Sequence, residues 1–209
     1  MPINGPKQAK YTLILAHGAG AGMDTPFMEH LACGIAKHGI RVIRFEFPYM
    51  QDRRKTGKKK PPNTMKILEE AWLQQIGMAG ENIIIGGKSM GGRVATRILS
   101  KSKAMGCVVF GYPFHPPGKP EKLRVAHLQE ITKPILILQG TRDPFGKQGE
   151  EMASYVPTSG LLHWIEDGEH SFKPRKSSGR TWEQNLDEAV TKTVAFVVDV
   201  VAKNQGSKD

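Results

Sequence analysis

The feature that most constrains this chain is a series of six short apolar segments, most of which lack the alternation of polar and apolar residues. Residues 83–85 are three isoleucines, and residues 135–138 read Ile-Leu-Ile-Leu. A strand that is apolar at every position must be covered on both faces, as strands of parallel sheets are. The predicted strands are residues 11–16, 41–47, 82–86, 106–110, 134–139 and 161–165.

Segments with a helical pattern lie between these runs, so that strands and helices alternate along the chain. The last of them should close the domain by packing on the sheet, because its apolar residues recur at steps of three and four. That face consists of Leu186, Ala189, Val190, Val194 and Val197, with Thr193 beside them. The predicted helices are residues 26–37, 64–76, 90–101, 147–156 and 181–203. The alternation predicts an α/β fold with a doubly wound, mostly parallel sheet of about six strands.

Two segments interrupt the alternation and are expected to be loops, residues 49–62 and residues 112–130. The first is basic and ends in two prolines, and the second contains four prolines. Neither is long enough for a folded cap. With 209 residues, the chain is expected to form one domain over residues 1–209, with loops alone around the mouth of its site.

The formal net charge of +10 is concentrated in two runs, residues 53–60 and residues 173–180. We favour two solvated loops as their interpretation, with the approach path of an anionic substrate and a nucleic-acid patch as the alternatives. A nucleic-acid partner is not expected.

The sequence also bears on location and on the thiols. Neither a secretory leader nor an 18-residue apolar run is present, so we expect a cytoplasmic protein that does not enter membranes. Cys33 and Cys107 lie in apolar stretches and are predicted to be buried, reduced thiols. Two cysteines so placed exclude a zinc site built on cysteine pairs.

Residues 87–91, Gly-Lys-Ser-Met-Gly, fit the pattern in which a serine stands between two glycines at a sharp turn from strand to helix. The turn needs small residues because strand and helix come very close there. An apolar run precedes Ser89 and a helical pattern follows it. Ser89 is therefore the candidate nucleophile, with an ordinary strand-to-helix turn as the alternative.

A serine hydroxyl needs a base beside it, and the base needs an acid to orient it. Asp143 follows the fifth predicted strand and His170 the sixth. Because the carboxyl ends of parallel strands meet at one edge, these residues are expected to gather there with Ser89. Asp167 and Glu169, close to His170 in sequence, stay open as alternatives for the acid.

Acyl transfer also needs donors for the oxyanion that develops in the transition state. The Met90 N–H is the first candidate, because it follows the nucleophile. The second is expected from the glycine-rich residues 17–22, with Ala19 or Gly20 as the donor. A flexible surface loop is the alternative interpretation of that segment.

Two further positions are candidate substrate contacts. Lys88 either attracts an anionic substrate or pairs with a carboxylate such as Glu46, and we favour the pairing. His115, like His127, lies in the proline-rich segment, which is expected near the mouth of the site.

Two glycine-rich turns invite a nucleotide-binding interpretation, but each fails at a required position. The dinucleotide fingerprint needs a glycine where Met23 or Thr25 stands, and the phosphate-binding loop needs one at Asn82. We therefore expect no cofactor, and no metal. The remaining alternative is a hydrolase-shaped protein that does not catalyse and instead acts as a binding or scaffolding module.

Five segments together resemble the dienelactone-hydrolase-like branch of the α/β-hydrolases. They are residues 17–20, 87–92, 111–120, 139–146 and 169–174. Within that branch the chain is most similar to the group that contains testis-expressed protein 30 and a larger chromatin-complex subunit. The resemblance implies a doubly wound sheet, a triad of Ser89, Asp143 and His170, and no cofactor. True dienelactone hydrolases use a cysteine nucleophile, so Ser89 departs from them.

The residues and the resemblance together predict a serine hydrolase of the carboxylesterase or thioesterase type. Its expected substrate is a small ester or thioester. The sequence does not decide whether the acyl group carries a negative charge.

Overall fold

Seven strands form one sheet at the centre of the computed structural model, which describes residues 1–205. The strand order is β1-β3-β2-β4-β5-β6-β7; β2 to β7 are parallel, and β1 runs antiparallel to β3. The doubly wound, mostly parallel sheet is thus confirmed. The strands are β1 (Ile3–Asn4), β2 (Thr12–Ala16), β3 (Arg41–Phe45), β4 (Ile83–Lys88), β5 (Gly106–Phe110), β6 (Ile135–Gly140) and β7 (Gly160–Ile165).

The four central strands explain the apolar runs. Every residue of β2, β4, β5 and β6 is buried, because helices cover both faces of the sheet. Sequence analysis missed β1, whose two residues at the edge carry no apolar run.

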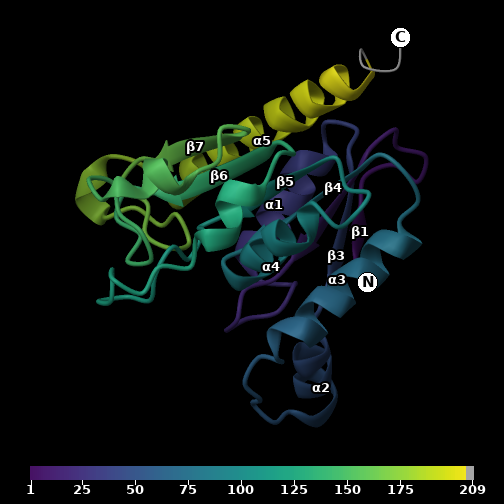
Figure 1. The fold of residues 1–209 in the computed structure, drawn as a ribbon, viewed down its shortest axis with the longest axis horizontal. Helices are drawn as coiled ribbons and strands as arrows, with labels where there is room; N and C mark the ends of the chain where they lie inside the picture. The colour runs from purple at the N-terminus through teal and green to yellow at the C-terminus, as the bar shows by residue number, and fades with distance from the viewer. Residues whose placement is uncertain (206–209) are drawn as a thin grey trace.

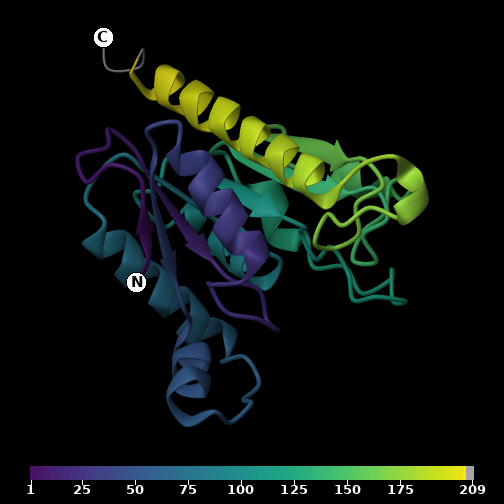
Figure 2. The ribbon, with the colours of Figure 1, turned by 180° about the vertical axis from the view of Figure 1, so that it is seen from behind.

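The helices divide between the two faces (Figures 1 and 2). α1 (Pro26–Ala36) and α5 (Trp182–Gln205) cover one face, where Leu31 and Val197 join the core with Leu13 of β2. α3 (Met65–Met78) and α4 (Met90–Leu99) cover the other, where Trp72 and Val94 pack with Ile85 of β4.

The order of the strands places the site. From β2 the chain first moves outward to β3 and then returns to β4 on the other side of β2. The connections after β2 and β4 therefore lead to opposite faces and separate at the carboxyl end of the sheet. Such a switch point is where ligands bind in open parallel sheets.

The expected loop over residues 49–62 is wrong for its first part, which is helix α2 (Pro48–Thr56). Pro48 occupies the first turn, where its missing N–H costs nothing, and Gly57 closes the helix with a φ of 70°. Figure 1 shows α2 projecting from the body below α3.

The helix predicted over residues 147–156 is also wrong. The structure has a 3-10 helix there, Glu151–Tyr155. Gly149 has a φ of 92°, outside the right-handed region that a helix requires.

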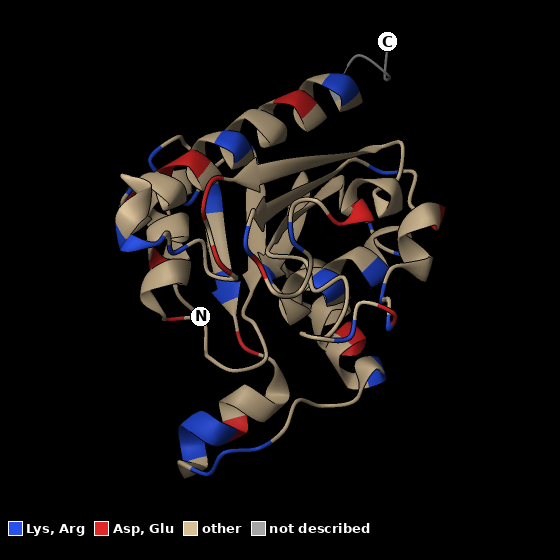
Figure 3. Ribbon diagram, turned by 90° about the vertical axis from the view of Figure 1, so that its left-hand side faces the viewer, with Lys and Arg blue, Asp and Glu red and all other residues tan. Residues whose placement is uncertain are grey.

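Basic residues gather on α2 and the chain that follows it (Figure 3). Most residues of this basic run are exposed, as the interpretation as a solvated loop predicts, although Arg54 also binds Glu46 and Asp24. In the second basic run, the exposed Arg175 binds Asp167.

Both cysteines are free, but only Cys107 is buried as predicted, whereas Cys33 is half-buried. Within residues 1–205, no helix combines the length and the apolar character that crossing a membrane requires.

Candidate active site

Ser89 stands at the turn between β4 and α4 with a φ of 51° and a ψ of −115°, a conformation that non-glycine residues rarely adopt. Two backbone hydrogen bonds hold it, from the Ser89 N–H to Phe110 O (3.0 Å) and from the Arg93 N–H to Ser89 O (2.9 Å). A Cβ at Gly91 would lie 2.4 Å from the His17 carbonyl oxygen. The sharp, glycine-dependent turn that the sequence predicts is present.

His170 and Asp143 lie side by side after β7 and β6. The His170 Nδ1 is 2.8 Å from Asp143 Oδ2, and the Asp143 side chain is fully buried. Asp143 also accepts hydrogen bonds from the Phe145 N–H (2.9 Å, to Oδ1) and from Gln139 Nε2 (3.0 Å, to Oδ2). A carboxylate only accepts, so Nδ1 carries the proton and Nε2 has a free lone pair. Burial lowers the pKa of His170 below its ordinary value, which favours the neutral base.

Sequence analysis missed Gln139, the last but one residue of β6. Its Oε1 accepts from the Tyr112 N–H at 2.7 Å, which fixes the amide so that Nε2 points to Asp143. The available signal was a polar residue at the end of an otherwise apolar run. Gln139 therefore orients the carboxylate that orients the histidine.

The two alternative acids are engaged elsewhere. The Asp167 carboxylate binds Arg175 and Arg142. The Glu169 carboxylate accepts from the N–H groups of Ser171 (2.7 Å) and Lys173 (3.2 Å). Of the three carboxylates considered, the one bonded to the His170 ring is that of Asp143.

The predicted pairing of Lys88 with Glu46 is wrong. Glu46 follows β3 and Lys88 ends β4, and β2 lies between these strands, so about 10 Å of sheet separates them. Lys88 Nζ instead donates to the backbone oxygen of His170. Burial lowers the pKa of Lys88 to about 8. Lys88 therefore anchors the loop that carries the histidine.

An apolar cavity of about 490 Å³ brings Ser89 and His170 to a common surface. Phe27, Met28 and Trp182 form much of its wall. In the part of the chain that the structure describes, the Ser89 hydroxyl forms no hydrogen bond. Across residues 1–205, no three His, Cys, Asp or Glu side chains gather as a metal site would need.

His115 is not a wall of this cavity, so its predicted role as a substrate contact is wrong. It is 2% exposed, and its ring bonds to Glu150 (3.0 Å) and to the Pro116 carbonyl oxygen (2.9 Å). His127 bonds to Thr96 at 2.9 Å and lies outside the cavity as well. His115 is therefore buried, and His127 is half-buried at a different pocket from the one that Ser89 lines.

The glycine-rich segment after β2 lines the same cavity at Ala19 and Gly20, whereas Met90 lines an adjoining groove. The Tyr49 hydroxyl, which comes from α2, donates to Ala19 O (2.9 Å) and Gly18 O (3.2 Å). In a trans peptide the N–H points opposite to the C=O, so the N–H groups of Ala19 and Gly20 point away from Tyr49. The segment is held by contacts rather than free, as a flexible loop would be.

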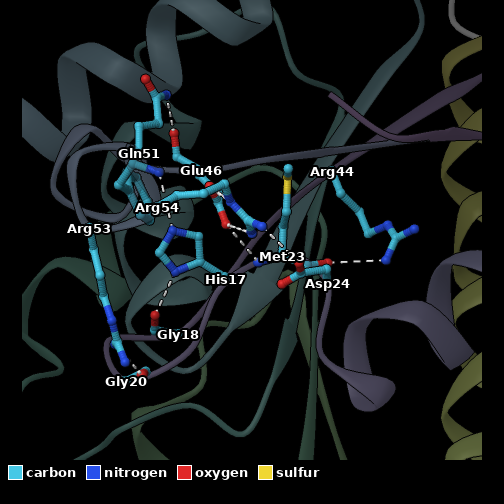
Figure 4. A network of polar contacts seen from close by, with 11 residues as sticks. His17, Gly18, Gly20, Met23, Asp24, Arg44, Glu46, Gln51, Arg53 and Arg54 are labelled. Carbon is cyan, nitrogen blue, oxygen red and sulfur yellow. Dashed lines mark hydrogen bonds and ion pairs between the residues drawn. The ribbon is translucent and has the colours of Figure 1, made fainter. Parts of the chain in front are cut away.

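A wider polar network fixes this segment to β3 and α2 (Figure 4). His17 lies at its centre: its Nε2 accepts from the Phe47 N–H (3.1 Å), and burial lowers its pKa. Arg53 donates to Gly20 O at 3.2 Å, and Arg54 joins Glu46 through two hydrogen bonds (3.0 and 2.5 Å). Arg53 therefore holds the backbone of the glycine-rich segment, and Arg54 joins α2 to Glu46 after β3 and to Asp24.

Replacing Tyr49 with phenylalanine is expected to lower kcat for an ester substrate about tenfold with little change in KM, because the carbonyls of Gly18 and Ala19 lose their donor. The loss should stay below the 10²- to 10³-fold that follows direct removal of an oxyanion donor. Steady-state kinetics measure it, with Tyr155→Phe as the matched control. Equal kcat in Tyr49→Phe and the wild type would contradict the positioning role.

A family model described as an alpha/beta hydrolase domain matches residues 9–198. The chain is similar to the esterase Est1E of Butyrivibrio proteoclasticus with bound ferulic acid (TM-score 0.70, 15% identity, 96% of this chain and 94% of that one). It is also similar to a dienelactone hydrolase of Anabaena variabilis (TM-score 0.69, 16% identity, 94% of this chain and 89% of that one). A third similar structure is an α/β serine hydrolase without a lid from Xanthomonas campestris (TM-score 0.62, 16% identity, 92% of this chain and 86% of that one). At these identities the structural likeness establishes the fold alone.

Proposed function

This chain belongs to the family of alpha/beta hydrolase domains, and from that premise we propose that it hydrolyses small carboxylic esters or thioesters through Ser89, His170 and Asp143. The observation that carries the proposal is the hydrogen bond between His170 Nδ1 and Asp143, because it leaves Nε2 as a base at the cavity that Ser89 also lines. An esterase and a serine hydrolase among the structural neighbours agree with it.

The proposed reaction is acyl transfer to water. His170 Nε2 accepts the hydroxyl proton of Ser89 as the oxygen attacks the carbonyl carbon, and the same proton then passes to the leaving alkoxide or thiolate. The N–H groups of Met90 and of Ala19 or Gly20 stabilise the oxyanion. A water molecule, deprotonated by His170, attacks the acyl-serine, and the carboxylic acid leaves as Ser89 regains its proton.

The narrower assignments are part of the same proposal. The five motif segments support membership of the dienelactone-hydrolase-like branch and, within it, the group of testis-expressed protein 30. The neighbouring dienelactone hydrolase supports the branch. We further propose one domain over residues 1–209, a cytoplasmic location, and action without a cofactor.

Covalent labelling tests the nucleophile without knowledge of the natural substrate. A fluorophosphonate is expected to add once to the folded protein, with peptide mapping placing the adduct on Ser89 and not on Ser171, which lines the same cavity. A folded protein that resists labelling would sink the catalytic proposal and favour a binding role.

The same labelling reports on the base. Only neutral His170 can accept the proton, and burial lowers its pKa below 6.5, so more than half of the molecules carry the neutral base at pH 6.5. The labelling rate at pH 6.5 should therefore exceed half of its plateau and fall at lower pH. A half-maximal rate at pH 7 or above would contradict this assignment of the base.

A further inference from the structure

A groove of about 360 Å³ adjoins the apolar cavity, and Ser89, Ala19 and Phe145 line both spaces. Apolar side chains make up most of the lining of both spaces. Each also has basic residues: Lys88 lines the cavity, and two arginines, Arg93 and Arg124, line the groove. None of the groove's lining residues is acidic.

Arg93 lies one helical turn from the nucleophile. Its N–H donates to the Ser89 carbonyl oxygen at 2.9 Å, and four residues of helix rise about 6 Å. The first turn of α4 has no acidic residue, and the N-terminal end of a helix is already the positive end of its dipole. A cation at this position disfavours the helix, so helix stability does not explain the residue.

The second arginine reaches the groove from the proline-rich segment. The Arg124 N–H donates to Phe114 O at 2.7 Å, and its carbonyl oxygen accepts from the Tyr112 hydroxyl at 2.8 Å. Tyr112 and Phe114 are themselves fully buried. The backbone that presents the Arg124 guanidinium is therefore held in place before any ligand arrives.

Positive charge at this groove lacks a protein counterion. Within residues 1–205, no carboxylate pairs with Arg93 or Arg124, whereas Arg97, one turn further along α4, binds Glu69 at 2.6 Å. The Arg93 Nε is buried without a hydrogen-bond partner. Burial, and then the nearby Arg97 and Arg93, lower the pKa of His127 to about 4. Arg93 and Arg124 border both this groove and a neighbouring pocket that His127 and Glu130 also line. An anion bound between the two arginines would meet positive charge that no ion pair within residues 1–205 neutralises.

We propose that Arg93 and Arg124 form a subsite for an anionic group of the substrate, a carboxylate or a phosphoryl oxyanion, while the apolar cavity takes the other half of the ester. The planar guanidinium fork suits either oxyanion and forms charge-assisted hydrogen bonds with it. This subsite rests on the proposed function, because it places the anion relative to Ser89.

Matched ester pairs test the subsite. Each pair consists of a neutral methyl ester and the analogue with a free carboxylate or a phosphonate at the same position, on the acyl half in one series and on the alcohol half in the other. The wild type is expected to prefer the charged member of at least one series about tenfold in kcat/KM. The double variant Arg93→Gln/Arg124→Gln should abolish that preference and change turnover of the neutral ester less than threefold.

Lys101→Gln is the control, because it removes a positive charge from an exposed position just beyond α4. It should keep the preference for the charged ester. The subsite would be overturned if the wild type prefers the charged ester in neither series. It would also be overturned if the double variant loses kcat/KM equally on charged and neutral esters, or if Lys101→Gln loses the preference as fully as the double variant does.

A binding measurement separates the failure of the subsite from the failure of the proposed function. If no ester is hydrolysed, the proposed function fails, and titration calorimetry with glutarate and with inorganic phosphate then decides the subsite. Saturable binding to the wild type that the double variant lacks supports it, and the anion that binds identifies the preferred oxyanion. Absent binding, or equal binding to both proteins, overturns it.

Discussion

Replacing Ser89 with alanine is expected to lower kcat for a nitrophenyl ester by about 10⁵- to 10⁶-fold. The alanine lacks the hydroxyl oxygen that attacks the carbonyl carbon of the substrate in the proposed mechanism, so no acyl-enzyme forms. Residual catalysis above that of water, about 10³-fold, should persist, because the oxyanion donors and the cavity stay in place. The measurement is steady-state hydrolysis together with loss of fluorophosphonate labelling.

Ser100→Ala provides the matched control, because Ser100 is an exposed serine directly after the last residue of α4. Its kcat should equal that of the wild type. Urea unfolding should show that Ser89→Ala remains folded. Activity in Ser89→Ala above a tenth of the wild-type value would assign the nucleophile to another residue.

Replacing Asp143 with asparagine is expected to lower kcat about 10⁴-fold through the wrong tautomer of His170. Three donors surround the carboxylate, from Phe145, Gln139 and His170. An amide cannot accept from all three, because one of its two ends is itself a donor. Where the amide nitrogen turns toward His170, it donates to Nδ1, and the ring proton moves to Nε2, which then cannot accept the Ser89 proton.

The same substitution should reduce the free energy of unfolding by about 1–3 kcal/mol, since Asp143 is fully buried and two donors would face each other. Asp167→Asn is the control, because Asp167 was an alternative acid and binds Arg175 and Arg142 instead. Its kcat should stay within about twofold of the wild type. If Asp167→Asn lost most of its kcat while Asp143→Asn stayed active, Asp167 and not Asp143 would be the carboxylate that orients His170.

Part of the candidate site could be predicted because a local sequence pattern or the order of the strands identifies its residues. Residues 83–101 combine an isoleucine strand, a serine between glycines and a helical pattern, and the close approach at Gly91 explains why only small residues fit. Asp143 and His170 were predicted because a serine nucleophile needs a base and an acid, and because both residues follow predicted strands whose carboxyl ends meet at one edge of a parallel sheet.

Other parts of the site depend on which segments meet. Tyr49 and Gln139 act through backbone atoms more than 25 positions away, at Ala19 and Tyr112, and such pairs leave no pattern in a single sequence. Glu46 was predicted as the partner of Lys88 because both residues lie at the carboxyl end of a strand. The order of the strands places β2 between them, and a single sequence does not show that order.

The sequence by itself determined the doubly wound sheet and singled out Ser89, His170 and Asp143 as candidates at its edge, because hydrophobic periodicity and turn chemistry are local properties of the chain. Only the tertiary structure decided how these groups are held: α2 supports the glycine-rich segment, Gln139 orients Asp143, and Arg93 and Arg124 share a groove. The physical reason is that a hydrogen bond or an unneutralised charge depends on its three-dimensional neighbours, and packing brings those together from distant parts of the chain.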